Sequence, residues 1–278
     1  MRYAHHVTAR ISQLVSHDAI AFLRQRAVTH GLVALSIGCI CAAACAADDE
    51  HITPYRPTVS NSAQLPVTGQ LELELGVLAA RNDAARTSLP YLLQLAFNQR
   101  WGILVGGDAV VTQRGDDGQS QRGIGNTSIT AKRAFVMNDA TAWGVELNTS
   151  LPTARSEIGG GKTDFGVNGI LSHDLGKTHL DANLNLTRVG AIDEDSSHWQ
   201  TGLSAALSTP LSARSSLATE LSGTRRPGAA STAQALLALA FSPSRRLTID
   251  VGVIKGLRAD ARNWSLFGGV VVPLAQLW

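Results

Sequence analysis

The chain has 278 residues, of which 44% are hydrophobic, and its formal net charge is only +2. Its basic residues are scattered singly or in pairs, so the composition gives no reason to expect nucleic acid as a partner. All three cysteines lie between residues 39 and 45, which excludes disulfides and thiolate metal sites from the rest of the chain.

The N-terminal residues have the pattern of a secretory signal sequence. Basic residues precede an uncharged apolar segment at 31–46, and an acidic run follows it. Residues 44–46 (Ala-Cys-Ala) form an A-x-A-like cleavage site, so we predict a cleaved signal peptide over residues 1–46. The alternative is cleavage before Cys45 with lipidation, but the Leu usually found ahead of such a cysteine is absent.

The next stretch, residues 47–68, contains Pro54, Pro57 and Pro66. Proline disfavours both a helix and a central strand, so we predict an extended N-terminal periplasmic segment. The sequence leaves open whether this segment stays in the periplasm or folds up into the rest of the chain.

From residue 69 onward, apolar and polar residues alternate in runs of about ten, which is the period of a β-strand. The clearest run is 180–187, where Leu and Ala alternate with Asp, Asn and Thr. No run of about 18 apolar residues, which a membrane helix needs, follows residue 47. The twelve expected strands are 69–80, 88–98, 100–111, 123–136, 141–152, 163–175, 179–190, 198–209, 214–223, 231–242, 246–255 and 263–274.

The connections between these strands alternate in length. Short turns are expected near 98–100, 137–140, 176–178, 210–213 and 243–245. Longer polar loops are expected at 81–87, 112–122, 153–162, 191–197, 224–230 and 256–262. An even number of strands with short periplasmic turns and long outer loops is typical of an outer-membrane barrel. We therefore predict an all-β fold over residues 69–278, a transmembrane antiparallel up-and-down β-barrel of about 12 strands in the outer membrane.

The aromatic residues support the barrel over the alternative, a soluble β-sandwich. A sandwich buries its aromatics in mid-strand, whereas a barrel places them in two girdles at the membrane interfaces, against the outer-membrane lipids. Here they lie on the apolar parity at the strand ends. The girdle expected near the short turns comprises Phe97, Trp101, Phe135, Trp143 and Phe241. The girdle expected beside the long loops comprises Tyr91, Phe165, Trp199 and Trp264.

The polar parity of the strands is mainly acidic and is expected to face the lumen. Its acidic members are Glu72, Glu74, Asp108, Glu146, Asp164, Asp181, Glu220 and Asp250, and Lys132 is the one clear inward base. Because unpaired carboxylates are costly to bury, they indicate a hydrated interior or Arg side chains that reach in from elsewhere. The arginines near the long loops are expected to contact the phosphates of lipopolysaccharide.

No set of residues has the spacing of a catalytic or metal site. His173 and His179 flank a short turn, and His198 points to the opposite face from its neighbour Ser197, so no Ser–His pair is expected. The acids at 193–195 fit solvated loop charges. The glycines at 159–161 lack the full phosphate-loop pattern. We therefore expect no enzyme activity, no cofactor and no metal.

Several short motifs occur in the order found in one known family. They are Gly123 to Asn126 through Lys132, Leu151-Pro152-Thr153, Gly161 to Asp164, Leu171 to Gly176, Asn185 to Gly190, Asp250 to Gly252, Gly256-Leu257 and Trp264 to Val272. Through them the chain resembles the outer-membrane transporter family named after the meta-pathway of phenol degradation, over most of residues 69–274. The chain departs from the family pattern at Asn126, where Asp is frequent, and at Ala154, where Gly is usual.

This resemblance implies transport of small, hydrophobic or aromatic molecules, without defined binding residues. The C-terminal Trp278 is expected to serve as the aromatic signal read by the barrel-assembly machinery. The prediction is a channel or transporter for small molecules, and an open lumen lined by these acids should prefer cations. The alternative is a non-conducting structural or envelope-interaction barrel with a plugged interior. A lipid-modifying outer-membrane enzyme is disfavoured because no nucleophile–base pair is found.

Overall fold

The computed structural model describes residues 52–81, 85–114, 118–258 and 264–278. The predicted signal peptide, residues 1–46, lies outside the described residues. Among the described residues, no helix is long and apolar enough to cross a membrane.

Thirteen strands are described, and all of them belong to one antiparallel sheet. They are β1 (Gln70–Arg81), β2 (Ala85–Ala96), β3 (Trp101–Arg114), β4 (Ser120–Gly123), β5 (Thr127–Asn138), β6 (Thr141–Leu151), β7 (Asp164–Leu175), β8 (Thr178–Arg188), β9 (Trp199–Pro210), β10 (Ser215–Arg225), β11 (Thr232–Ser244), β12 (Leu247–Gly256) and β13 (Trp264–Gln276). Each pairs with its neighbour in the sequence, except that β4 branches from β3 and β3 continues to β5.

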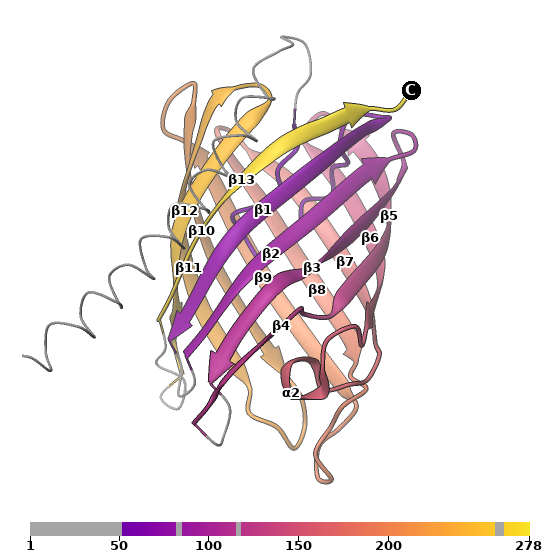
Figure 1. The fold of residues 1–278 in the computed structure, drawn as a ribbon. Helices are drawn as coiled ribbons and strands as arrows, with labels where there is room; N and C mark the ends of the chain where they lie inside the picture. Colours follow the sequence, from indigo (N-terminus) through magenta and orange to yellow (C-terminus); the bar gives the residue numbers. More distant parts are fainter. Residues whose placement is uncertain (1–51, 82–84, 115–117, 259–263) are drawn as a thin grey trace, which may run out of the picture. The chain divides into compact units, whose positions relative to one another are not determined.

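The sheet closes on itself because β1 pairs with β13 on one side and with β2 on the other, and β2 pairs with β3 (Figure 1). The predicted twelve-stranded antiparallel barrel is thus confirmed, with β4 as an additional short strand. The expected strand 123–136 is split. Strand β4 ends at Gly123 and β5 begins at Thr127, and between them the Gly125 amide donates to the Asp108 carbonyl of β3 (2.8 Å).

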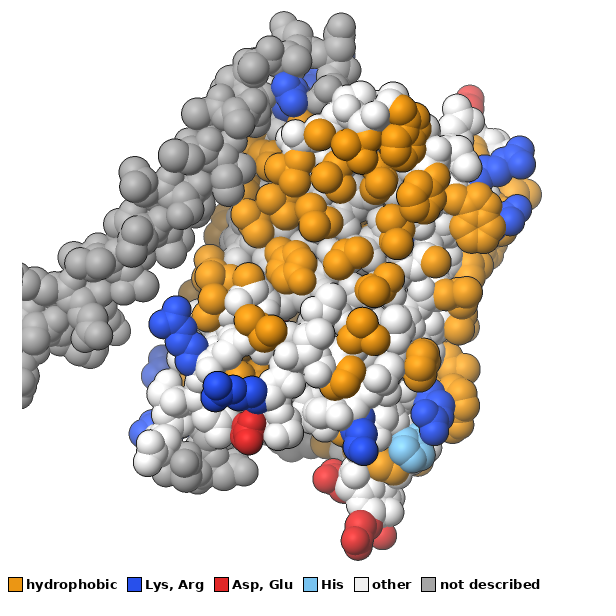
Figure 2. Space-filling view, turned by 45° about the vertical axis from the view of Figure 1, so that its right-hand side comes forward, with side chains coloured by type: hydrophobic (Ala, Val, Ile, Leu, Met, Phe, Trp, Pro, Cys, Tyr) orange, Lys and Arg blue, Asp and Glu red, His pale blue; other side chains and the backbone are white. Residues whose placement is uncertain are grey.

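Alternation along the strands separates an apolar outer face from a polar inner face. On β10, Glu220 is 3% exposed, whereas the next residue, Leu221, is 63% exposed. Figure 2 shows hydrophobic side chains spread over the outer wall, with charged side chains gathered toward the two ends. The wall therefore presents to lipid the face that a soluble protein would bury.

The two ends of the barrel differ in their connections. The short-turn end carries the connections 97–100, 139–140, 176–177, 211–214 and 245–246, together with the C-terminus. The long-loop end carries among others residues 152–163, which include the short helix α2 (Ser156–Gly159), and residues 189–198 and 226–231. The first expected long loops, 81–87 and 112–122, are shorter than expected because β1, β2 and β3 continue further in that direction.

Residues 52–68, here called the plug segment, enter the barrel instead of remaining below it as a periplasmic segment. The segment begins at the short-turn end, where the Ile52 amide donates to the Arg245 carbonyl (3.1 Å), and returns there to a bridge between Thr68 and Ala96. Between these points it has no regular secondary structure, as its prolines indicate. Its position differs from the expected one because inward polar side chains of the wall bind its backbone.

Candidate functional site

The lumen of the barrel is the candidate site, and its lower part is built around the plug segment. On the β1 and β2 side, the Glu72 carboxylate accepts a hydrogen bond from the Thr53 amide (3.1 and 3.2 Å to its two oxygens). Glu74 Oε1 accepts from the Tyr55 amide (2.7 Å). Gln94 Nε2 donates both to Glu74 Oε1 (3.0 Å) and to the Thr53 carbonyl (3.4 Å). Two wall carboxylates thus satisfy backbone donors of the segment.

The β10 and β12 side holds the segment through two further carboxylates. Arg56 forms a bidentate ion pair with Asp250, with Nε–Oδ2 and Nη2–Oδ1 distances of 2.8 and 2.9 Å. Glu220 Oε2 accepts from the amides of both Val59 and Ser60, each at 2.8 Å. Charge-assisted and bidentate bonds of this kind are stronger than neutral ones and restrict geometry.

A third set of contacts comes from β6, β7 and β8. The Asn61 amide donates to Asn183 Oδ1 (2.8 Å), and Asn183 Nδ2 donates back to the Asn61 carbonyl (2.9 Å). Asn61 Nδ2 also donates to Glu146 Oε2 (2.7 Å), and the Ala63 amide donates to Ser172 Oγ (2.8 Å). Because the partners come from strands around the whole barrel, the segment crosses the lumen.

Lys132 on β5 is fully buried beside the segment. Its Nζ donates to Tyr55 Oη and to the Ser62 carbonyl, and lies 3.5 Å from Glu146 Oε1. The ammonium also lies 4.2 Å from the centre of the Tyr55 ring. The inward lysine therefore binds both the wall and the plug segment.

The structure places the predicted lumen residues in two groups. Seven are at most 8% exposed: Glu72, Glu74, Lys132, Glu146, Asp181, Glu220 and Asp250. Asp108 and Asp164 are partly exposed near the long-loop end, where Asp108 pairs with Arg86 (3.1 Å) and Asp164 accepts from the Gly190 amide (2.8 Å). All eight carboxylates are engaged, and two arginines, Arg56 and Arg86, reach in to them.

Sequence reasoning missed the residues of the plug segment itself, above all Tyr55, Arg56 and Asn61. One signal could have found them. The predicted lumen had eight acids against one base, and Arg56 is the one charged residue between 52 and 68. A segment that carries a lone cation and many free backbone amides has the groups that an acidic interior needs.

The predicted girdle residues lie mostly exposed on the outer wall. Eight of them are 40–54% exposed: Phe97, Trp101, Phe135, Trp143, Phe165, Trp199, Phe241 and Trp264. Tyr91 is half-buried and pairs with Gly107, where an added Cβ would lie 3.4 Å from the Tyr91 ring. Near the short turns, the Arg133 guanidinium lies 4.8 Å from the ring centres of both Trp101 and Phe135.

The plug segment separates two cavities inside the barrel. On the short-turn side, a cavity of about 250 Å³ lies between residues 52–64 and the side chains of His179, Asp181 and Ser208. On the long-loop side, a cavity of about 290 Å³ has Val59 and Asn61 on its plug side and amide and hydroxyl side chains of β6 to β11 around it. The second cavity is here called the amide cavity.

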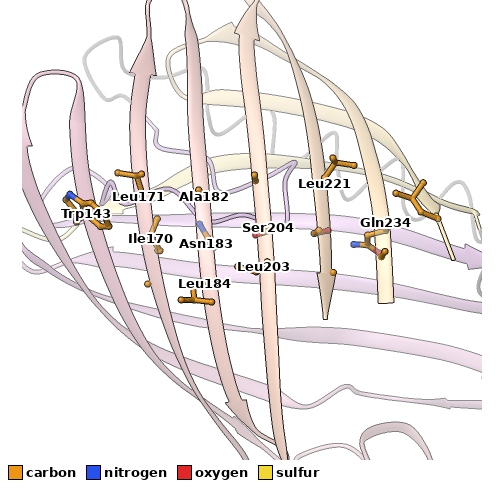
Figure 3. Close-up of a pocket in the computed structure, with 16 residues that line it drawn as sticks. Trp143, Ile170, Leu171, Ala182, Asn183, Leu184, Leu203, Ser204, Leu221 and Gln234 are labelled. Atoms are coloured by element: carbon orange, nitrogen blue, oxygen red, sulfur yellow. The ribbon is translucent and has the colours of Figure 1, made fainter. Parts of the chain in front are cut away.

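A third hollow, of about 770 Å³, lies on the outer wall over β6 to β11. Its exposed side chains are apolar and include Trp143, Leu184, Leu203 and Leu221. Figure 3 shows Leu184 beside Asn183 on β8 and Leu203 beside Ser204 on β9. The same stretch of wall thus separates an apolar outer hollow from the amide cavity inside.

Among the described histidines, His173 Nδ1 lies 2.9 Å from the Thr141 hydroxyl, whereas no hydrogen bond joins Ser172 to His179. Ser172 Oγ donates to Asp181, and His179 lies between Asp174 (2.5 Å) and Asp181 (3.3 Å), so carboxylates stand between the serine and the imidazole. Among the residues that the structure describes, no group of three His, Cys, Asp or Glu could hold a metal ion.

A family model described as "Putative MetA-pathway of phenol degradation" matches residues 55–273. Among solved structures, the COG4313 outer membrane channel from Pseudomonas putida F1 is 14% identical, with 78% of this chain and 100% of that chain covered and a TM-score of 0.63. The NanC porin is 10% identical, with 73% and 100% covered and a TM-score of 0.53. The KdgM porin in complex with oligogalacturonate is 10% identical, with 73% and 99% covered and a TM-score of 0.50. No curated protein matches the chain.

Proposed function

Because the chain belongs to this phenol-degradation family and shares the fold of outer-membrane channels, we propose that it carries small molecules across the outer membrane. The observation that supports the proposal is the closed barrel of twelve strands with an apolar outer wall and a polar lumen. In this orientation the short-turn end faces the periplasm, and the long-loop arginines meet lipopolysaccharide. Trp278 is the proposed signal for the barrel-assembly machinery.

The plug segment implies that the described form of the channel is closed. Its contacts with β1, β2, β5 to β8, β10 and β12 span the lumen, so a solute passes only when the segment moves aside. The same network supports the second candidate function, a non-conducting structural barrel, in which the segment is a permanent brace. Movement of the segment is therefore what distinguishes the two functions.

The lumen also bears on the class of solute. Its eight inward carboxylates do not suit an acidic oligosaccharide such as the oligogalacturonate named for the KdgM porin. The family description connects its members with phenol degradation, which points to aromatic compounds. On the inner wall, Phe267 is buried in a cluster with Leu236 and Ala238, and the residues that line the amide cavity include no aromatic side chain.

The proposal is tested by conductance in planar bilayers. We expect the mature protein to give rare or small currents, and a variant that lacks residues 52–64 to give a steady single-channel current. The heat-denatured variant, added at equal concentration, controls for leakage. A deletion variant that is folded but passes no current would contradict the channel and favour the structural barrel.

A further inference from the structure

The inner wall on the long-loop side of the plug segment carries two adjacent rows of neutral polar residues. Strand register places the residues of each row side by side across β7 to β11. The first row is Asn168, Asn185, Gly202, Thr224 and Thr232. The second row is Asn183, Ser204, Ser222 and Gln234. These rows form one side of the amide cavity.

The amide cavity is lined by few charged groups, although the lumen as a whole is acidic. Among the described residues that line it, Glu146 is the one charged side chain. Glu146 Oε2 accepts from Asn168 Nδ2 (3.0 Å) and Asn61 Nδ2 (2.7 Å), and its Oε1 lies 3.5 Å from Lys132 Nζ. Lys132 of β5 thus neutralises the one charge, and the surface offered to a solute consists of amides and hydroxyls.

Two polar atoms in this wall lack hydrogen-bond partners within the described part of the chain. They are Asn168 Oδ1 and Ser222 Oγ, each with its atom buried. Their burial keeps both atoms out of a solute's reach, so the partly exposed Asn185 and Gln234 are the amides that a hydrogen-bonding occupant would meet. Glycines keep the space open, since a Cβ at Gly166 would lie 3.0 Å from Asn148 Oδ1.

We propose that the amide cavity binds a small uncharged solute with several hydroxyl groups, of the class of a monosaccharide or cyclic polyol. Such hydroxyls both donate and accept, as the amides of Asn185 and Gln234 do. A phenol would displace water from these amides and replace its hydrogen bonds through a single hydroxyl, and no described residue lining the cavity is aromatic. The volume of about 290 Å³ is at the lower end for ligand pockets. This inference rests on the proposed channel and names its solute class.

The test is equilibrium dialysis of the detergent-solubilised mature protein against radiolabelled D-glucose, myo-inositol and phenol. We expect saturable binding of glucose or inositol and none of phenol. The double variant Asn185→Leu/Gln234→Leu replaces two amides by apolar side chains, so binding should weaken about tenfold or more. Thr219→Leu makes a similar change on the outer face of β10, where Thr219 is exposed, and should leave binding unchanged.

Heat-modifiable migration on gels shows whether each variant is folded. If the double variant does not fold, the milder Thr224→Val takes its place and should weaken binding about threefold. Preferential binding of phenol, no saturable binding of either polyol, or full binding by the folded variants would overturn the inference. Dialysis requires no conduction. A barrel that binds glucose but never conducts refutes the channel, whereas one that conducts without binding refutes only the amide cavity.

Discussion

At the scale of single residues, the Arg56–Asp250 pair joins the plug segment to β12. The Asp250 side chain is 1% exposed, so removal of Arg56 leaves a buried charge without its partner. Loss of one partner of a buried pair costs about 3–5 kcal/mol. We expect Arg56→Met to loosen the plug segment, measured as faster hydrogen exchange at residues 53–63.

The matched control is the double variant Arg56→Met/Asp250→Leu. Replacing both partners of a buried pair by apolar residues is often neutral or stabilising, so protection of residues 53–63 should return toward that of the parent. Unchanged exchange in Arg56→Met alone would show that the pair does not hold the segment.

The outer wall gives a second prediction at this scale, set by depth in the membrane. Trp143 lies near a short turn and is 50% exposed, whereas Val105 lies in the middle of β3 on the same outer parity. We expect Trp143→Arg to destabilise the barrel by about 1 kcal/mol and Val105→Arg by about 2–4 kcal/mol, measured by folding into bilayers. Equal effects would mean that the depth assignment is wrong.

At the scale of elements, the loop that carries α2 is hydrogen-bonded to Asn126, which lies between β4 and β5. Asn126 Nδ2 donates to the Gly159 carbonyl (3.1 Å), and Asn126 Oδ1 accepts from the Ala154 amide (3.3 Å). A Cβ at Gly159 would lie 2.3 Å from Asn126 Oδ1, so this position has no room for a side chain.

We therefore expect Gly159→Ala to release the loop, seen as faster hydrogen exchange over residues 153–162 with the strands unaffected. Gly118→Ala is a control for glycine substitution at the same end, because no atom lies within 4 Å of a Cβ placed there. The control position has a positive φ of 76°, so some local strain is expected, but it should not spread to residues 153–162. Equal hydrogen exchange over residues 153–162 in both variants would contradict the role of these contacts in holding the loop.

The strands were predictable from sequence because one physical rule governs them all. Each strand has lipid on one side and polar groups on the other, so the period of two is strong, and Leu180 to Thr187 shows it without interruption. The split at Gly125 was not predictable, because a local departure from a ladder depends on partners in other strands. The location of the plug segment inside the lumen was not predictable, because it depends on hydrogen bonds from the backbone amides of residues 53–60 to Glu72 and Glu220. Such contacts leave no periodic pattern in the sequence.

At the scale of the whole molecule, the plug segment binds carboxylates of the lumen that would otherwise face water. Without it, Glu72, Glu74, Glu220 and Asp250 lose their partners from residues 53–60. An acidic, low-dielectric passage attracts cations. We expect the variant lacking residues 52–64 to prefer K⁺ over Cl⁻, measured as a reversal potential in a KCl gradient.

Neutralising two of the remaining acids should weaken that preference. Glu146→Gln and Asp181→Asn, introduced together into the deletion variant, remove two of the eight inward charges and should move the reversal potential toward zero. The pair Glu157→Gln/Asp174→Asn, at exposed positions near the two ends, is the control. A deletion variant without ion selectivity would show that these acids do not line open water.

The route of the plug segment through the lumen has a topological consequence. The plug segment enters the lumen beside Arg245 and leaves it at Gly69, at the same end of the barrel. It therefore forms a loop that reaches into the lumen and returns, and it does not pass through the barrel from one end to the other. Such a loop can be withdrawn without opening any strand pair, including the seam between β1 and β13. The order of assembly is correspondingly free: the wall can close first, and the loop can dock into it afterwards, as many times as its contacts are broken and remade.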